Sequence, residues 1–273
     1  MSGSWTTVAR KEFRDAGRSR SLWALTALMV LSVAVAVYII GFLLSAAPED
    51  GGMTGAALVG GMAQQGRFFI TSLVSVLGLM VAYASIVGER SSGSLKLLLG
   101  LPYSRRDVIL GKFFGRAAVF AAATVAAFIV GFLVLLSYGV VAPIDYLFLV
   151  LITTVLGVAY VSVGVAVSAS IRTRSRAAAA AVGVFFFFKF LWDTSLVPRV
   201  VVYVARRDMS ALTSPPGWYE YLVALGPNVA YSNLAGGYVG SFGNVEVFSA
   251  AVLVGWVVVP VFLGWRVFET GDL

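Results

Sequence analysis

The chain has 273 residues, of which 59% are hydrophobic and 12% charged, and this composition predicts a polytopic membrane protein with no room for a soluble catalytic domain. Its 20 Lys and Arg against 13 Asp and Glu give a formal net charge of +7, which in a membrane protein indicates basic cytoplasmic loops and attraction to anionic lipid rather than nucleic-acid binding. There is no Cys and no His, which excludes disulfides, thiol chemistry, the usual haem and zinc ligand sets and a His general base.

Residues 1–21 are expected to form an amphipathic helix at the membrane surface. Trp5, Val8, Phe13 and Ala16 recur at helical spacing, while most of the charged residues around them fall on other faces. The aromatic side chains suit the boundary between lipid and water. The sequence therefore predicts an interfacial helix on the inner leaflet.

Six apolar runs follow, and the chain is expected to be a single all-α transmembrane domain over residues 1–273. A helix needs about 20 predominantly apolar residues to cross the ~30 Å hydrocarbon core. The runs contain no Asp or Glu, so a proton relay of the kind used by secondary transporters is hard to build from them. The expected spans are residues 22–44, 68–87, 113–137, 146–171, 177–192 and 247–265.

Residues 88–112, between the second and third spans, are expected to be a cytoplasmic loop that contains a short helix. The stretch from Ser94 to Leu99 is amphipathic, with leucines at helical spacing and Lys96 on the other side. Basic residues gather here, which indicates the cytoplasmic side of the membrane. They are Arg90, Lys96, Arg105, Arg106, Lys112 and Arg116.

A sharp turn is expected after this short helix. Gly100 and Pro102 end it, and Ser104 is placed to cap the next helix. Asp107 stands three residues later, in the arrangement of a capping box. The loop is therefore predicted to read helix, turn, helix.

Small residues recur at a spacing of four, as in Gly111 and Gly115 and again in Ser162, Ala166 and Ser170. Such pairs allow helices to cross closely. The chain is so rich in Ala, Gly and Ser that the same pairs also arise by chance. The sequence leaves both interpretations open.

Lys189 is the only charge in the interior of an apolar run, because Arg116 stands in the first turn of the run 113–137. One interpretation makes it a contact for a substrate or a counter-ion, because charges inside a membrane are expensive and usually functional. The favoured interpretation uses Asp193, four residues further on at the outer boundary. There the stem of Lys189 can run along the aromatic side chains so that its ammonium group reaches the interface.

Residues 193–246 are expected to be a long outer loop, with short interfacial or re-entrant pieces that are too broken to span. The distribution of Lys and Arg supports placing residues 193–246 on the outer side of the membrane. With the N-terminus inside, fifteen of the 20 Lys and Arg lie in inner segments and four in outer ones. The sequence therefore predicts a plasma-membrane protein with both termini in the cytoplasm.

The loop after the second span resembles that of the permease subunits of type-2 ABC transporters. In that family it carries a Glu-Arg or Glu-Lys pair, a Gly, a Leu-rich stretch, a Pro, and a Ser/Thr-Arg pair before a Gly-Lys pair. The six-span layout extends the resemblance to the rest of the chain. The positions that agree, without a gap, are Glu89, Arg90, Gly93, Ser94, Leu95, Leu98, Leu99, Pro102, Ser104, Arg105, Gly111 and Lys112.

The resemblance implies that this loop is the coupling helix, which docks on an ATP-binding subunit. Leu95, Leu98 and Leu99 would be the docking side chains, Glu89 and Arg90 would anchor or steer the contact, and the N-terminal helix would lie beside it. The candidate coupling site comprises Glu89, Arg90, Gly93, Ser94, Leu95, Leu98, Leu99, Pro102, Ser104 and Arg105.

The resemblance also implies the partners, namely two ATP-binding cassette subunits and a second permease subunit, identical or related. The chain itself has no Walker A motif, because Gly111-Lys112 is followed by Phe113 instead of Ser or Thr. ATP and Mg²⁺ are therefore expected on the partner. We expect no catalytic residue, cofactor or metal in this chain, and no enzyme activity of its own.

The expected function is that of a permease subunit that moves a substrate across the cell membrane, by export, with ATP hydrolysis on a separate subunit. The alternative is a membrane anchor or assembly protein that transports nothing and recruits a cytoplasmic partner through its inner loop. An ATP-independent channel is disfavoured because the spans show no polar lining stripe. Nothing in the sequence names a substrate.

Overall fold

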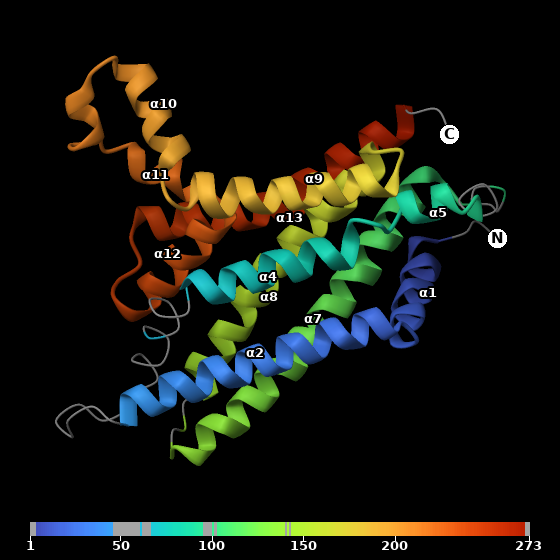
Figure 1. Ribbon diagram of the computed structural model, residues 1–273, viewed down its shortest axis with the longest axis horizontal. Helices are drawn as coiled ribbons and strands as arrows, with labels where there is room; N and C mark the ends of the chain where they lie inside the picture. The colour runs from blue at the N-terminus through green and yellow to red at the C-terminus, as the bar shows by residue number, and fades with distance from the viewer. Residues whose placement is uncertain are drawn as a thin grey trace.

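The computed structural model describes residues 4–45, 61, 67–94, 100, 103–139, 141 and 143–270. All regular structure within these residues is helical, which confirms the all-α expectation (Figure 1). Six of the described helices are long and apolar enough to cross a membrane, as predicted. These candidate spans are Leu22–Leu43, Phe68–Ser91, Arg105–Ser137, Pro143–Ser170, Arg174–Trp192 and Asn244–Thr270.

The helices follow one another with short connections. α4 continues through a short turn into α5, and α9 continues directly into the π-helical turn η1. In chain order the elements are α1 (Trp5–Gly17), α2 (Arg20–Ser45), α4 (Arg67–Ala82), α5 (Val87–Ser91), α7 (Arg105–Ser137), α8 (Pro143–Ser170), α9 (Arg174–Phe186), η1 (Phe187–Trp192), α10 (Leu196–Arg206), η2 (Met209–Leu212), α11 (Tyr219–Ala224), α12 (Pro227–Val239) and α13 (Asn244–Thr270).

Local sequence explains why α7 begins well before the apolar run. The Ser104 side chain accepts a hydrogen bond from the backbone N–H of Asp107, and the Asp107 carboxylate accepts one from the Ser104 N–H. This reciprocal arrangement is the predicted capping box, and it is confirmed. Because the cap lies nine residues before Phe113, the polar stretch from Arg105 becomes the first turns of the same helix.

α8 is the centre of the bundle. It contacts α4, α7 and α13, while α1 and α2 pack on α7 from outside. The most apolar stretches of α4 and α8 are each 67% buried within the protein, against 22–33% in the other four spans. The outer helices α2, α7, α9 and α13 therefore leave large apolar faces uncovered, as helices that face lipid do.

Residues 193–246 hold more structure than a loop. They contain α10, η2, α11 and α12, and α12 packs against α13 and α8 with eight of its residues buried. Pro227 stands in the first turn of α12, where its missing N–H costs nothing. In Figure 1 α10 projects sideways at the end of the bundle opposite to α1 and α5.

α1 buries part of its apolar stripe together with one charged residue. Val8 and Ala16 are buried in the protein, Trp5 and Phe13 are 38% and 47% exposed, and the third buried residue is Glu12. The burial of Glu12 was not expected from the sequence. Its carboxylate finds cationic partners on α7, which compensate for its removal from water.

Candidate functional site

α1 crosses α7 at a point where two glycines replace side chains. A Cβ at Gly111 would collide with the Val8 side chain and lie 2.9 Å from the carbonyl oxygen of Trp5, and one at Gly115 would overlap the Cβ of Glu12. The four-residue pair Gly111 and Gly115 thus serves close helix crossing, and the chance interpretation is excluded for it. The crossing brings the charged side chains of both helices together.

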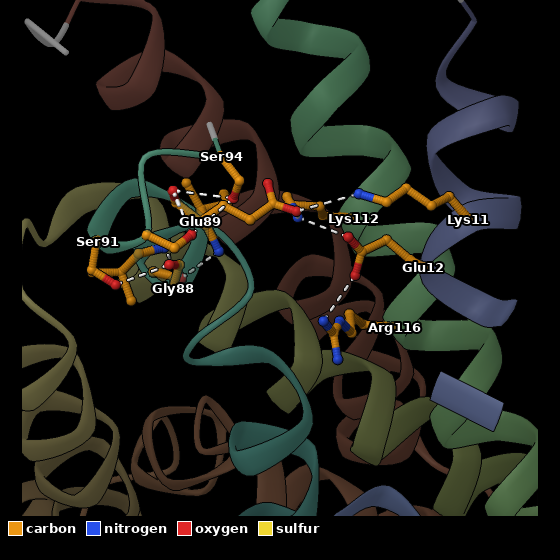
Figure 2. A network of polar contacts seen from close by, with 12 residues as sticks. Lys11, Glu12, Gly88, Glu89, Ser91, Ser94, Lys112 and Arg116 are labelled. Atoms are coloured by element: carbon orange, nitrogen blue, oxygen red, sulfur yellow. Dashed lines mark hydrogen bonds and ion pairs between the residues drawn. The ribbon is translucent and has the colours of Figure 1, made fainter. Parts of the chain in front are cut away.

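A cluster of charged side chains fills this crossing, and Figure 2 shows it from close by. The Lys112 ammonium nitrogen lies 2.8 Å from a Glu12 carboxylate oxygen and 2.9 Å from one of Glu89. Arg116 contacts the second Glu12 oxygen at 2.8 Å, and Lys11 approaches Glu89 at 3.8 Å. We call Lys11, Glu12, Glu89, Lys112 and Arg116 the α1–α7 charge cluster.

Lys112 is the hub of this cluster. Its side chain is 1% exposed and that of Glu12 is 5% exposed, whereas Glu89 is 21% exposed. Removing one partner of a buried ion pair leaves an uncompensated charge, so these side chains hold one another in place. Because Lys112 lies on α7 and touches carboxylates of α1 and α5, the hub joins three elements that are distant in the sequence.

Glu12 is held in its charged form. Burial by itself raises the pKa of a carboxyl group, but Lys112 and Arg116 outweigh burial here, and the pKa of Glu12 lies below its ordinary 4.5. A group with a lowered folded-state pKa contributes its stability above the unfolded value. That contribution is therefore complete above about pH 4.5 and is lost as the pH falls through the lowered pKa.

The start of α5 is bonded to α8. The Ser168 hydroxyl accepts hydrogen bonds from the backbone N–H groups of Ile86 and Val87, at 2.9 and 3.0 Å. These donors lie at the N-terminal end of α5, where no partner within the helix is available. α5 is thus fixed at its beginning by α8 and at Glu89 by α7 and α1.

The other end of this region is tied to the last span. The Arg105 guanidinium donates to the carbonyl oxygens of Phe268 and Glu269, at 2.8 and 2.9 Å. These carbonyls belong to the last turn of α13, which lacks helical donors. Arg90 lies 5.9 Å from the Phe268 ring and donates to the carbonyl oxygen of Ile171 at 3.5 Å.

The remaining candidate residues divide into two groups. Gly93 adopts φ +77°, a left-handed conformation that favours glycine, and the Ser94 hydroxyl lies 2.9 Å from that of Ser92 and 3.4 Å from the carbonyl oxygen of Glu89. The segment after Ser91 therefore turns back on α5. The other group lies outside the described residues and comprises Leu95, Leu98, Leu99 and Pro102.

Sequence reasoning missed three contributors to this region, namely Glu12, Arg116 and Phe268. A signal for Glu12 was present, because Val8, Glu12 and Ala16 recur at a spacing of four, like Gly111 and Gly115. Matching the two stripes predicts that Glu12 meets α7. No signal marked Phe268, whose role depends on contacts formed only in the folded bundle.

A second buried polar group surrounds Lys189 and corrects the expectation made for it. Its side chain is 3% exposed, so the ammonium group is enclosed by the protein instead of lying along its surface, although the expected contact with Asp193 is present. The ammonium nitrogen lies 2.7 Å from the Thr71 hydroxyl, 3.3 Å from an Asp193 carboxylate oxygen and 4.4 Å from the centre of the Phe68 ring. These groups replace water, so Lys189 is held inside the protein.

The fold and the site define a class of protein. It is a polytopic helical membrane protein whose polar end is built from α1, α5 and the start of α7. Within the described ranges no three His, Cys, Asp or Glu residues group as metal ligands would. The polar groups of this end are paired with one another, an arrangement suited to positioning helices and not to bond-making chemistry.

Comparison with known proteins identifies the family. A family model described as ABC-2 family transporter protein matches residues 6–273, almost the whole chain. The chain belongs to the ABC-2 family of transporter proteins. In this family the permease subunit has no ATPase activity, and ATP binding belongs to the ATPase subunit.

Two curated relatives are similar to part of the chain. A probable ABC transporter permease protein NosY of Pseudomonas aeruginosa is 37% identical over 122 residues, which are 45% of this chain and 42% of the relative. A probable ABC transporter permease protein NosY of Stutzerimonas stutzeri is 36% identical over 130 residues, or 47% and 44%. The chain therefore spans less than half the length of each relative in these matches.

Proposed function

We propose that this chain is the permease subunit of an ABC transporter and that it moves a substrate across the cell membrane while a separate subunit hydrolyses ATP. The family match, the six apolar spans and the lack of a Walker A motif support this proposal. The similarity to probable ABC transporter permease proteins points the same way. The substrate stays open, and export is the direction we propose.

The observation that carries the mechanism is the double contact of Lys112. The segment from Glu89 to Arg105 is the proposed coupling site, and Glu89 at its beginning is bound to Lys112, which also binds Glu12. A push on this segment by the ATP-binding subunit reaches α7 and α1 through that hub. It also reaches α13 through Arg105, at the other end of the segment.

The proposed assembly has two permease subunits and two ATP-binding subunits. The spans α9 and α13 are only 22% and 28% buried in the single chain, which leaves surface for a second copy as well as for lipid. We propose an orientation with both termini in the cytoplasm, because α1, α5 and the C-terminal end of α13 lie at one end of the bundle together with most of the basic residues (Figure 1).

A non-transporting membrane anchor is the competing function. It would recruit a cytoplasmic partner through the same segment, but the partner would have no need to move the spans. The two functions differ in one expectation. A coupling segment must be rigidly connected to the spans, and the contacts of Glu89, Arg90 and Arg105 with α7, α8 and α13 favour coupling.

The experiment that tests this proposal is co-purification of the permease with a candidate ATP-binding cassette protein encoded beside it, in lipid. Leu95→Asp with Leu98→Asp places charges in the proposed docking helix, so retention of the ATP-binding subunit should fall at least about tenfold. Val141→Asp, at a residue that is 73% exposed near the opposite end, is the matched control and should retain the subunit. Equal retention by all three proteins would contradict docking through these leucines, and failure of the parent chain to retain any ATP-binding subunit would favour the anchor.

A further inference from the structure

The polar group around Lys189 links four helices inside the bundle. Lys189 contacts Thr71 and Phe68 of α4 and Asp193 just beyond η1. Asp193 accepts a hydrogen bond at 3.0 Å from the side-chain amide of Asn228, the second residue of α12. The side-chain carbonyl oxygen of Asn228 accepts two further hydrogen bonds. One comes from the Ser75 hydroxyl of α4 at 3.1 Å, and the other from the Tyr160 hydroxyl of α8 at 3.0 Å.

All the described members of this group except Phe68 are shielded from solvent. Thr71 and Ser75 are fully buried, Asn228 is 2% exposed and the Asp193 side chain is 13% exposed. Phe68 is 62% exposed, and the centre of its ring lies 4.4 Å from the Lys189 ammonium nitrogen. Within the described part of the chain, an exposed aromatic ring is therefore in direct contact with a buried cation.

The backbone at Lys189 is unusual. η1 is a π-helical turn that follows α9 without a break, and its last bond runs from the Asp193 N–H to the Phe188 carbonyl oxygen. π-helical turns are rare and are frequently found at functional sites. Here the turn accompanies the placement of Lys189 beside Thr71, 118 residues away in the sequence.

The same two helices separate further along their length. A groove of about 250 Å³, open on one side, lies between Val76, Met80 and Tyr83 of α4 and Ala178, Val182 and Phe185 of α9. We call the contact between α4 and the α9–η1 helix the seam. The seam is hollow towards the α5 end of the bundle and closed by Lys189 at the other end.

We propose that Lys189 is a positioning residue for transport, which holds the seam closed at the end that the proposed orientation places outside. This inference rests on the proposed permease function, because a gate has a role only in a transporter. The contacts of Lys189 are of a kind that can break and form again during a transport cycle. The ion pair with Asp193 lies within one helical segment, at i and i+4, so it persists when α4 moves away.

The described contacts of Lys189 across the seam are not ion pairs. They include the hydrogen bond from Lys189 to Thr71 and the contact of its ammonium group with the Phe68 ring. Breaking them does not strand a buried charge without its counter-ion, because Asp193 stays with Lys189. Closure is therefore specific but reversible, as an outer gate requires.

The test is thiol labelling of a cysteine placed at Val76 in the seam groove. The chain has no native Cys, so the substituted residue is the only thiol. A membrane-impermeant maleimide is added from the outside to right-side-out vesicles that hold the permease without an ATP-binding subunit. Lys189→Met should raise the labelling rate about ten- to a hundredfold, since a hydrogen bond to a charged group is lost across the seam.

Two further variants separate gating from stability. Thr71→Val removes the partner across the seam but keeps the ion pair, and it should also speed labelling. Lys189→Arg keeps a cation and should stay close to the parent rate. If Lys189→Met and Thr71→Val lower the thermal midpoint but label at the parent rate, Lys189 only stabilises the bundle and the proposal is wrong.

The readout is independent of the coupling proposal. Labelling is measured on the permease alone, so it stands even if no ATP-binding subunit is retained in co-purification. Conversely, retention that depends on Leu95 and Leu98 says nothing about Lys189. The two proposals therefore fail separately.

Discussion

Lys112 lies where α1, α5 and α7 meet, and its side chain is 1% exposed. It neutralises carboxylates that come from two directions, Glu12 of α1 and Glu89 of α5. A nearby lysine, Lys11, approaches the same Glu89 at 3.8 Å but is 54% exposed. Solvent screens that contact, so the two lysines should differ greatly in their contribution to stability although both touch Glu89.

Lys112→Met should destabilise the permease by about 3–5 kcal/mol, the usual cost of removing one partner of a buried ion pair. Without the Lys112 ammonium group, Glu12 keeps its contact with Arg116, but Glu89 loses its 2.9 Å contact. Lys11→Met is the matched control and should cost less than about 1 kcal/mol. Thermal unfolding in lipid measures both, and equal shifts for the two variants would contradict the assignment of Lys112 as the hub.

At the scale of elements, the position of α1 depends on the absence of side chains on α7. Gly111 lies under Val8 and the Trp5 carbonyl, and Gly115 lies under Glu12. The crossing then sets the distances within the α1–α7 charge cluster. Shape and charge at this crossing support each other, because the close approach is what allows Lys112 to reach Glu12.

Gly111→Ala should displace α1 from α7, since the added Cβ meets backbone as well as a side chain. A bifunctional thiol cross-linker between Trp5→Cys and Phe114→Cys reports the crossing, because the contact between the two rings, 4.8 Å apart between centroids, shows that these side chains face each other. We expect this cross-link to form several-fold more slowly in the Gly111→Ala background. Gly183→Ala is the control, because a Cβ there meets nothing within 4 Å, and unchanged rates in both backgrounds would contradict the crossing.

The elements that sequence predicted well are those with a local cause. The spans follow from runs of apolar residues, and the start of α7 follows from the Ser104–Asp107 capping box. The buried faces were harder. Nothing in the sequence marks Glu12 and Lys189 as buried in the protein. Their partners on α7 and α4 help to compensate for the loss of hydration.

The π-turn η1 and the helices between Asp193 and Glu246 were also beyond the sequence pattern. α12 is short and contains Gly and Asn, which disfavour an isolated helix, so packing against α8 and α13 must stabilise it. The candidate coupling residues were predicted from a resemblance. The structure adds the connections of Glu89, Arg90 and Arg105 to the spans.

At the scale of the whole molecule, the two buried charged groups lie towards opposite ends of the bundle. The α1–α7 charge cluster joins α1, α5 and α7, and the group around Lys189 joins α4, α8, η1 and α12. α4 and its continuation α5 contribute to both. In the proposed cycle, a push at Glu89 of α5 is thus delivered through the short turn before it to α4, whose other end carries the proposed gate.

The measurement that tests this account most directly is the ATPase rate of the permease with its ATP-binding subunit in lipid, with the parent chain, Glu89→Gln and Lys11→Met. Glu89→Gln removes the charge that binds Lys112 while leaving the proposed docking leucines intact. The account predicts that this variant retains the ATP-binding subunit but loses permease-dependent ATPase stimulation about tenfold, whereas Lys11→Met keeps it. Full stimulation by Glu89→Gln would contradict the account, because the push would then reach the spans without the α1–α7 charge cluster.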